Sequence, residues 1–316
     1  MIPNNIKNED LDNLKSILNY LKQLSDDGVS PLIEKQILFL LDNLVPFFSN
    51  LVMTGIFPEI HRLTINERVL GENKRIRDFK YLKYPSANKV SYYGRCNYPQ
   101  QSILYSSMFH VTTINEIQPH VGDLMTASIW RVKNNQTLTY CPIFKNQPKG
   151  DNIINPRLLD FNKIYNEKLK DHPENIREHI DSLVQFITEV FTKRIDAKNH
   201  IDYIFSAYFS NKIFNDFENG AIEAIYYPSV KDGLSFENLA IKPDAFESKY
   251  ELIEVQDSVC INVPTAGKGG HFSQVLSKCK NFDYVSEKIL WDSNQIYQTP
   301  QGLSHLISQY KINISE

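Results

Sequence analysis

Apolar residues near the start of the chain follow the spacing of a helix. Leucine and isoleucine recur every three or four positions over Leu11–Leu21, and the polar run Asp26-Asp27-Gly28 follows them. This spacing predicts a helix that buries one stripe. Ser30-Pro31 predicts a second helix, with Ser30 as its N-cap and Pro31 at its first position. Because these helices carry no side chain of catalytic type, we interpret residues 1–54 as a small helical extension.

After residue 55 the pattern changes to short segments rich in β-branched and aromatic residues, with turn residues between them. Such segments predict strands. Helical spacing returns where apolar residues form one stripe from Ile176 to Val190. The mixture predicts an α+β domain over residues 55–316, with a mixed β core and surrounding helices. Strands are expected over residues 59–65, 102–109, 124–132, 221–230, 237–246 and 252–263, and helices over 174–193 and 201–217.

The composition argues against several classes of protein. A chain of 316 residues with a formal net charge of -3 has no basic excess for direct nucleic-acid binding. No apolar run reaches the roughly 18 residues that cross a membrane, and the first ten residues contain no apolar leader. We therefore expect a cytoplasmic protein without a membrane partner. The four cysteines are widely spaced and offer no paired thiols, so no metal is expected. The glycine-rich stretch 265–272 lacks the spacing of a phosphate-binding loop and predicts a turn.

Four residues stand out by their chemistry and position. Arg62 lies in a predicted strand, and Arg95 follows a glycine that would let a ligand approach the backbone. A guanidinium offers a planar fork of donors that fits phosphate. Glu116 is a lone acid in an uncharged run, where a buried carboxylate needs a specific partner. Ser206 lies close to the start of a predicted helix.

Three of these residues also have a purely structural interpretation. Arg95 is equally explained by a surface ion pair, and Glu116 by a helix cap. A serine such as Ser206 is most often an N-cap or turn hydroxyl. The residues alone therefore predict a mixed α/β protein with an anion pocket, and no particular reaction.

Taken in order, five segments of the chain resemble the RES domain, a family named for an Arg, a Glu and a Ser spread along its sequence. The most specific parts are Gly94-Arg95-x-Asn97, the pair Leu104-Tyr105, and Thr113-x-x-Glu116. The matching stretch runs from about Phe57 to Phe246. Its segments are IHRLTI, YYGRCNYPQQSILYSS, TTINEIQPHVGD, YIFSAYFSNKIF and AIEAIYYPSVKDGLSFENLAIKPD.

The resemblance implies an ADP-ribosyltransferase-like fold that binds NAD+ as its substrate. It also implies a toxin or effector that breaks the nicotinamide–ribose bond by phosphorolysis or hydrolysis, with phosphate as a candidate co-substrate and no metal. In this family a small antitoxin usually silences the toxin, so an antitoxin or another regulatory protein is an expected partner. The N-terminal helices offer restraint in cis as a further arrangement.

Carried over residue by residue, the resemblance gives each matching position a role. Arg62 and Arg95 would neutralise the pyrophosphate of NAD+, and Asn97 belongs to the same cofactor-binding motif. Tyr105 would stack on the nicotinamide or the ribose. Glu116 would stabilise the oxocarbenium-like transition state as nicotinamide departs. We therefore predict Arg62 and Glu116 as catalytic residues.

The family serine has two candidates. Ser206 lies in the helix-start segment and would be catalytic, whereas Ser229 lies in the Tyr-Pro-Ser segment and would bind the cofactor. The sequence departs from the family at Ala207, where glutamine often follows the serine, and at Leu63, where an aromatic or small residue usually follows the arginine. These departures leave the acceptor of the ADP-ribosyl group open.

Three alternatives accompany this interpretation. The first keeps the fold and transfers ADP-ribose from NAD+ to a protein side chain. The second is a HEPN-like ribonuclease, because Arg194 and His200 fit an Arg-x5-His pattern that also arises readily by chance. The third is a module that binds a nucleotide without turning it over.

Overall fold

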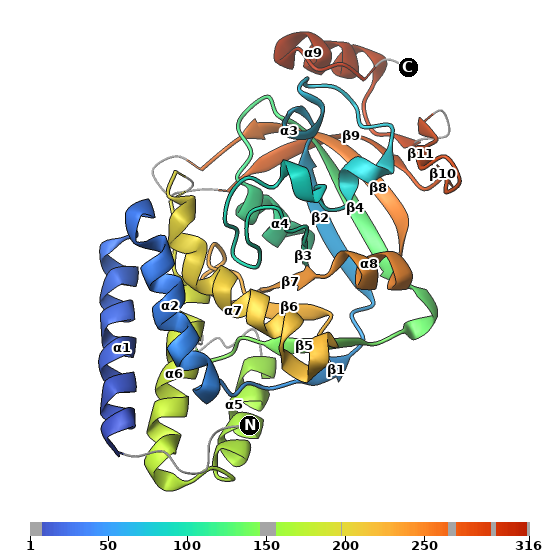
Figure 1. The fold of residues 1–316 in the computed structure, drawn as a ribbon. Helices are drawn as coiled ribbons and strands as arrows, with labels where there is room; N and C mark the ends of the chain where they lie inside the picture. The colour runs from blue at the N-terminus through green and yellow to red at the C-terminus, as the bar shows by residue number, and fades with distance from the viewer. Residues whose placement is uncertain (1–7, 146–155, 197, 265–269, 292–294, 315–316) are drawn as a thin grey trace. The chain divides into compact units, whose positions relative to one another are not determined.

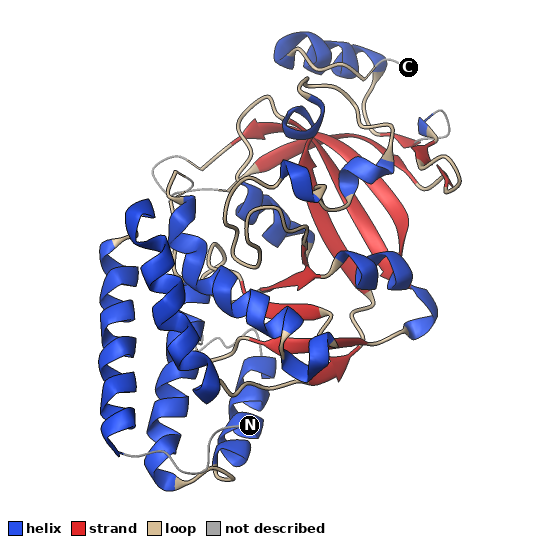
Figure 2. Ribbon diagram, in the orientation of Figure 1, coloured by secondary structure: helices blue, strands red, loops and turns tan. Residues whose placement is uncertain are grey.

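The computed structural model describes residues 8–145, 156–196, 198–264, 270–291 and 295–314. The chain is a mixed α+β protein, as predicted, in which helices and strands alternate along the sequence (Figures 1 and 2). It divides into two compact units, each built from separate stretches of chain. Unit 1 comprises Met1–Gly55, Ser86–Ile103 and Leu138–Ala240, and unit 2 comprises Ile56–Pro85, Leu104–Thr137 and Ile241–Glu316.

Unit 1 contains a group of packed helices (Figure 1). The predicted break and cap near residue 30 are confirmed, since the Ser30 side chain accepts a hydrogen bond from the backbone N–H of Leu32 and Pro31 is the first residue of a short 3-10 helix. The amphipathic pattern predicted from residue 174 is confirmed as well. The helices are α1 (Asn8–Asp27), α2 (Glu34–Leu44), α5 (Pro156–Leu169), α6 (Glu174–Thr192) and α7 (Ile204–Asn215), with 3-10 turns η1 (Pro31–Ile33), η2 (Val45–Phe47), η4 (Ala87–Lys89), η6 (His200–Tyr203) and η7 (Phe217–Gly220).

Residues 1–54, predicted as a helical extension, are grouped with later stretches of the chain in unit 1. Helix α1 packs against α2 and α6, and α2 packs against α7. An amphipathic helix needs a partner for its apolar stripe. Two of these partners, α6 and α7, come more than a hundred residues later in the sequence, so a local pattern cannot identify them.

Four short strands also belong to unit 1. Their order is β1 (Met53–Gly55), β5 (Leu138–Pro142), β6 (Ala224–Pro228) and β7 (Glu237–Ile241). Strand β5 pairs antiparallel with β1 and parallel with β6. The strand predicted over 237–246 is too long, because Pro243 opens helix α8 (Pro243–Lys249). Proline is favoured at the first position of a helix, where its missing N–H has no helical partner to lose.

Unit 2 is built on an antiparallel sheet with the strand order β3, β2, β4, β8, β9 and β12. The predicted bounds of β2 (Glu59–Ile65) and β4 (Leu124–Val132) are confirmed. The other strands of the sheet are β3 (Leu104–Ser107), β8 (Tyr250–Asn262), β9 (Phe272–Cys279) and β12 (Gln295–Ile296). The remaining elements are α3 (Asn66–Leu70), η3 (Phe79–Leu82), α4 (His110–Ile117), η5 (Lys133–Asn135), β10 (Phe282–Asp283), β11 (Lys288–Ile289) and α9 (Pro300–Tyr310).

A buried ion pair holds the loop after α3 to strands β8 and β9 of this sheet. Arg75 Nε lies 2.6 Å from the carboxylate of Asp257, and the side chains are 9% and 0% exposed. Arg75 also donates to Ser277, and Thr126 donates to the second oxygen of Asp257. The guanidinium carbon lies 4.4 Å from the ring centre of Trp291. Every strong polar group in this cluster therefore has a partner.

Most of the glycine-rich stretch 265–272 lies outside the described residues. Among the helices of the described chain, none combines the length and apolar character needed to cross a membrane.

Candidate functional site

Arg62 is a half-buried arginine with unused hydrogen-bonding capacity. It lies on β2, and its Nη1 donates to the backbone carbonyl of Tyr105, 2.9 Å away. Its Nε is buried and has no hydrogen-bond partner among the described residues. Burial lowers the pKa of Arg62 to about 10, with no neighbouring carboxylate offsetting that loss of hydration. Buried charges are normally paired, so this guanidinium lacks the anion that its environment calls for.

The neighbours of Arg62 follow from the alternation of side chains along β2. Leu63 and Ile65 pack with α4 through Ile114 and Ile117. Because successive residues of a strand point to opposite faces, Arg62 and Thr64 lie on the face away from α4. The Oγ1 of Thr64 is also buried and without a partner in the described part of the chain. One face of β2 thus presents two unsatisfied polar side chains two residues apart.

Tyr105 contacts the Arg62 side chain through the backbone carbonyl of Tyr105. The register pairs His61 with Ser107 on β3, which puts the side chains of His61 and Ser107 on one face. Tyr105, two residues from Ser107, shares that face, and it is the face covered by α4. Its ring therefore projects to the opposite side from the Arg62 guanidinium, while its carbonyl accepts the Arg62 hydrogen bond.

Glu116 lies near the end of α4 and is half-buried. Since α4 covers the Leu63 face of β2, Arg62 and Glu116 lie on opposite sides of that strand. Within unit 2 the predicted residues therefore fall into two groups: Tyr105 and Glu116 belong to the α4 side, and Arg62 to the other.

Arg95 belongs to unit 1 and caps a helix. Its Nη2 donates to the carbonyl of Lys193 at 3.2 Å, and its Nη1 donates to the carbonyl of Phe191. The guanidinium also lies over the ring of Tyr203, 5.2 Å from its centre. The last carbonyls of a helix have no partner within the helix and carry partial negative charge, so a cation stabilises them. Arg95 performs that role at the C-terminal end of α6.

Ser206 is almost fully buried in the first turn of α7 and lies in the same neighbourhood. Its hydroxyl donates to the carbonyl of Tyr203, 3.2 Å away. Ser210, one turn later, donates to the carbonyls of Ser206 and Arg95. The structure thus brings Arg95 and Ser206 together around α7, through the hydroxyl of Ser210 and their own backbone carbonyls.

The remaining predicted residues shape turns of unit 1. The side-chain amide of Asn97 donates to the carbonyls of Tyr92 and Tyr98. Ser229 follows β6 and is fully buried, and its hydroxyl accepts a hydrogen bond from the N–H of Asp232. Side-chain-to-backbone bonds of this kind are typical of turns.

Arg194 and His200, the residues of the ribonuclease alternative, lie between α6 and α7. Arg194 follows the end of α6, and His200 opens the 3-10 helix η6. The His200 ring stacks on Tyr92, with centres 4.8 Å apart. The two residues therefore lie in the connection between α6 and α7.

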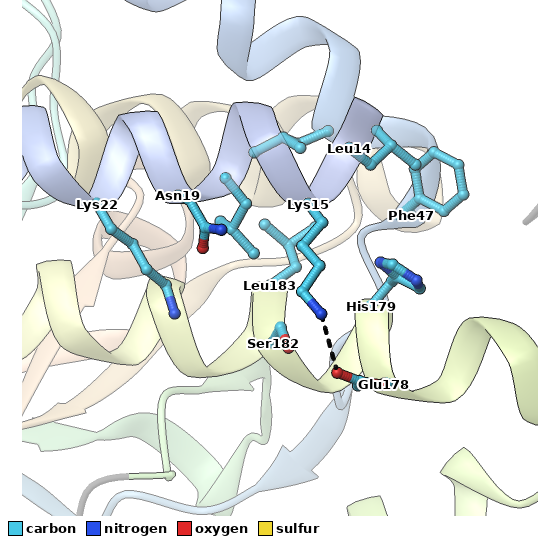
Figure 3. Close-up of a pocket in the computed structure, with 11 residues that line it drawn as sticks. Leu14, Lys15, Asn19, Lys22, Phe47, Glu178, His179, Ser182 and Leu183 are labelled. Atoms are coloured by element: carbon cyan, nitrogen blue, oxygen red, sulfur yellow. Dashed lines mark ion pairs between the residues drawn. The ribbon is translucent and has the colours of Figure 1, made fainter. Parts of the chain in front are cut away.

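A shallow groove lies between α1 and α6 in unit 1 (Figure 3). Leu14, Phe47 and Leu183 contribute apolar side chains to it, and the ion pair Lys15–Glu178, 3.7 Å long, crosses it. Both charged side chains are largely exposed, so this pair contributes little stability. None of the residues predicted for catalysis or cofactor binding lines this groove.

Thr64 is the residue of this region that the sequence analysis missed. Threonine is common in strands, so the sequence does not single out this residue. Only the folded structure shows that its hydroxyl has no hydrogen-bond partner among the described residues.

For metals, the described residues contain no group of three or more His, Cys, Asp or Glu side chains placed to hold an ion. Comparison with known protein families and with curated proteins found no match for this chain.

Proposed function

We propose that this chain is an NAD+-consuming enzyme with an ADP-ribosyltransferase-like fold of the RES type, which breaks the nicotinamide–ribose bond by phosphorolysis or hydrolysis. The order of the five family-like segments along the sequence supports the proposal. The observation that carries it is Arg62, a half-buried guanidinium with a free Nε donor and no carboxylate beside it. An arginine in that state fits a phosphate anion that arrives from outside the protein.

In this proposal Arg62 binds the pyrophosphate of NAD+. The free Nε can donate to one phosphate oxygen, and the hydroxyl of Thr64 on the same face of β2 adds a second donor. A bound pyrophosphate would supply an opposite charge to Arg62 and hydrogen bonds to Arg62 and Thr64, whose buried polar atoms have no contact with water. Arg95 is left out of the pyrophosphate site, because its donors are engaged at the end of α6.

The proposed reaction breaks the bond between C1′ of the ribose and the nicotinamide nitrogen. The bonding electron pair leaves with nicotinamide, which departs as a neutral molecule. A phosphate oxygen or a water oxygen then bonds to C1′, and water loses a proton in doing so. A carboxylate favours the positive charge that develops on the ribose. Glu116 is our candidate for that carboxylate, although it lies across β2 from Arg62.

Nicotinamide release from NAD+ by the purified protein tests the proposal. We expect release by the native protein, ADP-ribose as the product without phosphate, and its 1″-phosphate where phosphate is the acceptor. Arg62→Gln should weaken NAD+ binding at least tenfold, which corresponds to about 1.4 kcal/mol. Arg131→Gln is the matched control, since Arg131 lies on the same sheet but is exposed and paired with Glu59. Native protein that neither binds NAD+ nor releases nicotinamide would refute the proposal.

The same experiment separates the related alternatives. Adenine-labelled NAD+ that becomes fixed to a protein would indicate ADP-ribosyl transfer to a side chain. NAD+ binding without nicotinamide release would indicate a non-catalytic module. Glu116→Gln should lower release without lowering NAD+ affinity if its carboxylate acts in the transition state alone. We further propose a cytoplasmic site of action and an antitoxin or regulatory protein as partner, which NAD+ measurements in expressing cells with and without a neighbouring gene would test.

A further inference from the structure

Two histidines approach each other on the α4 side of unit 2. His61 lies on β2 and shares a face with Leu63, which packs against α4. His110 is the first residue of α4, three residues after the end of β3. Their ring centres are 6.4 Å apart, with the ring planes tilted by 56°. Both residues are half-buried, so the pair lies at the border of the packed interior.

The ring nitrogens of this pair have unused hydrogen-bonding capacity. Nδ1 of His61 is buried and has no partner in the described part of the chain. None of the described residues forms a hydrogen bond with the ring of His110 either; the bond at this residue goes to its backbone carbonyl, from Thr113. Buried polar atoms in folded proteins are nearly always satisfied. The buried Nδ1 of His61, beside a second imidazole, therefore indicates a missing hydrogen-bonding ligand.

The N-terminus of α4 begins at the same place. Its N-cap, Phe109, has no side-chain oxygen to cap the helix, and the N–H of Phe109 itself donates to the hydroxyl of Ser107. The first N–H groups of a helix have no partner within the helix and carry partial positive charge, which favours an anion. Thr112, in this first turn, is fully buried, and its Oγ1 is without a partner among the described residues.

The surrounding charges permit an anion to bind. Two carboxylates lie near His61, and both are already engaged by cations. Glu59 pairs with Arg131 at 2.7 Å, and Glu254 pairs with both Lys278 and Lys280 at 3.2 Å. Burial lowers the pKa of both histidines, and the positive charge of Lys278 lowers that of His110 further, whereas Glu59 and Glu254 raise that of His61. The imidazoles therefore become cationic at acid pH, while the two nearby carboxylates are already paired with cations.

We propose that His61, His110 and the first N–H groups of α4 form a binding site for a tetrahedral oxyanion, as in a phosphate monoester. The anion accepts hydrogen bonds from the imidazole N–H groups and from the helix terminus. Two large apolar side chains next to the site, Phe109 and Val111, are 46% and 52% exposed and can contact the organic part of such an ester. This site lies across β2 from Arg62, so it is distinct from the proposed pyrophosphate site.

Sulfate is the appropriate probe, because it stays a dianion at both pH 6 and pH 8, whereas phosphate itself titrates in that range. The experiment follows the imidazole C–H signals of the full chain by NMR during sulfate titrations at constant ionic strength. His61→Asn and His110→Asn assign the two signals and remove one donor each. His120→Asn is the control, since that side chain is 84% exposed in the same unit.

We expect the His61 and His110 signals to shift saturably with sulfate at pH 6. If binding takes up one proton, the affinity should fall roughly tenfold for each pH unit above the histidine pKa values. His110→Asn should weaken binding at pH 6 by about tenfold, the loss of one charge-assisted hydrogen bond. Arg62→Gln should leave the response unchanged, which separates this site from the proposed pyrophosphate site.

Three results would overturn the inference: no response of these signals to sulfate, equal affinity at pH 6 and pH 8, or an equal response in His110→Asn. Far-UV circular dichroism establishes that each variant is folded. If His61→Asn does not fold, the pH dependence of the native protein together with His110→Asn still decides the outcome.

Discussion

Arg62 and Arg95 are both arginines of family-like motifs, yet the two regions of the molecule use them differently. At the end of α6, Arg95 donates to the carbonyls of Phe191 and Lys193, so its fork of donors is engaged by the fold. On β2, Arg62 donates to one carbonyl and keeps a buried Nε donor free. A buried arginine therefore indicates a ligand only when part of the hydrogen-bonding capacity of its guanidinium is unused by the protein.

The largest effect on stability is expected for a third arginine, Arg75. Its guanidinium in unit 2 is paired with Asp257 and donates to Ser277. Asp257→Asn removes the charge that Arg75 needs, while both groups stay buried. Breaking a buried ion pair in this way should lower the free energy of unfolding by about 4 kcal/mol, measured by urea denaturation. Glu59→Gln breaks the exposed pair with Arg131 on the same sheet and should cost less than about 1 kcal/mol. Equal losses for the two variants would contradict the distinction.

The next largest effect is expected for Arg95. Arg95→Met keeps much of the side-chain volume but removes the donors at the end of α6. Losing charge-assisted hydrogen bonds to helix carbonyls should cost about 2–3 kcal/mol in the same denaturation assay. Arg95→Lys keeps the charge and should restore part of the loss. A stability equal to that of the native protein would show that the cap does not matter, and would free Arg95 for a ligand.

For Arg62 the expected effect on stability is smaller. Arg62→Met removes one hydrogen bond to Tyr105 but also removes a buried charge without a counter-ion. These effects oppose each other, so the free energy of unfolding should change by no more than about 1 kcal/mol. NAD+ affinity, in contrast, should fall in the same variant. A loss of stability as large as that of Arg95→Met would mean that Arg62 is a structural residue.

The local pattern was sufficient for some elements and insufficient for others. The strands 59–65 and 124–132 were predicted with their observed bounds, because alternation and β-branched residues agree with central strands of a sheet. Helix α4 was not predicted, since Val111, Thr112 and Thr113 disfavour a helix. It forms where Ile114 and Ile117 can pack on the sheet, which is a tertiary effect.

The same limit applies to the site residues. The motif around Arg95 fits phosphate chemistry, but the carbonyl that its guanidinium binds lies 96 residues away in the sequence. No local pattern reveals whether a donor meets a ligand or a distant carbonyl. Likewise, Arg62 and Glu116 were predicted as one catalytic group, and only the packing of α4 on β2 shows that they lie on opposite faces of the strand.

The smallest expected effect is a pH dependence on the α4 side of β2. The pKa values of His61 and His110 are lowered in the folded protein, first by burial. The unfolded chain therefore binds protons more readily, and stability must fall as the pH drops below about 6.5, the ordinary histidine value. The contribution of the two histidines to the free energy of unfolding is complete above that pH. It is lost progressively as the pH falls toward their pKa values in the folded protein.

The measurement that isolates this contribution is the thermal midpoint between pH 5 and pH 8 for the native protein and for His61→Asn combined with His110→Asn. The double variant should show a flatter curve, because the groups whose protonation favours unfolding are gone. Added sulfate should raise the midpoint of the native protein at pH 5.5 more than that of the double variant, since only the native protein gains from an anion bound to imidazolium. If Arg62→Met, and not the double histidine variant, flattened the pH dependence of the thermal midpoint, the titrating groups would lie on the Arg62 face of β2. That result would contradict the assignment to His61 and His110.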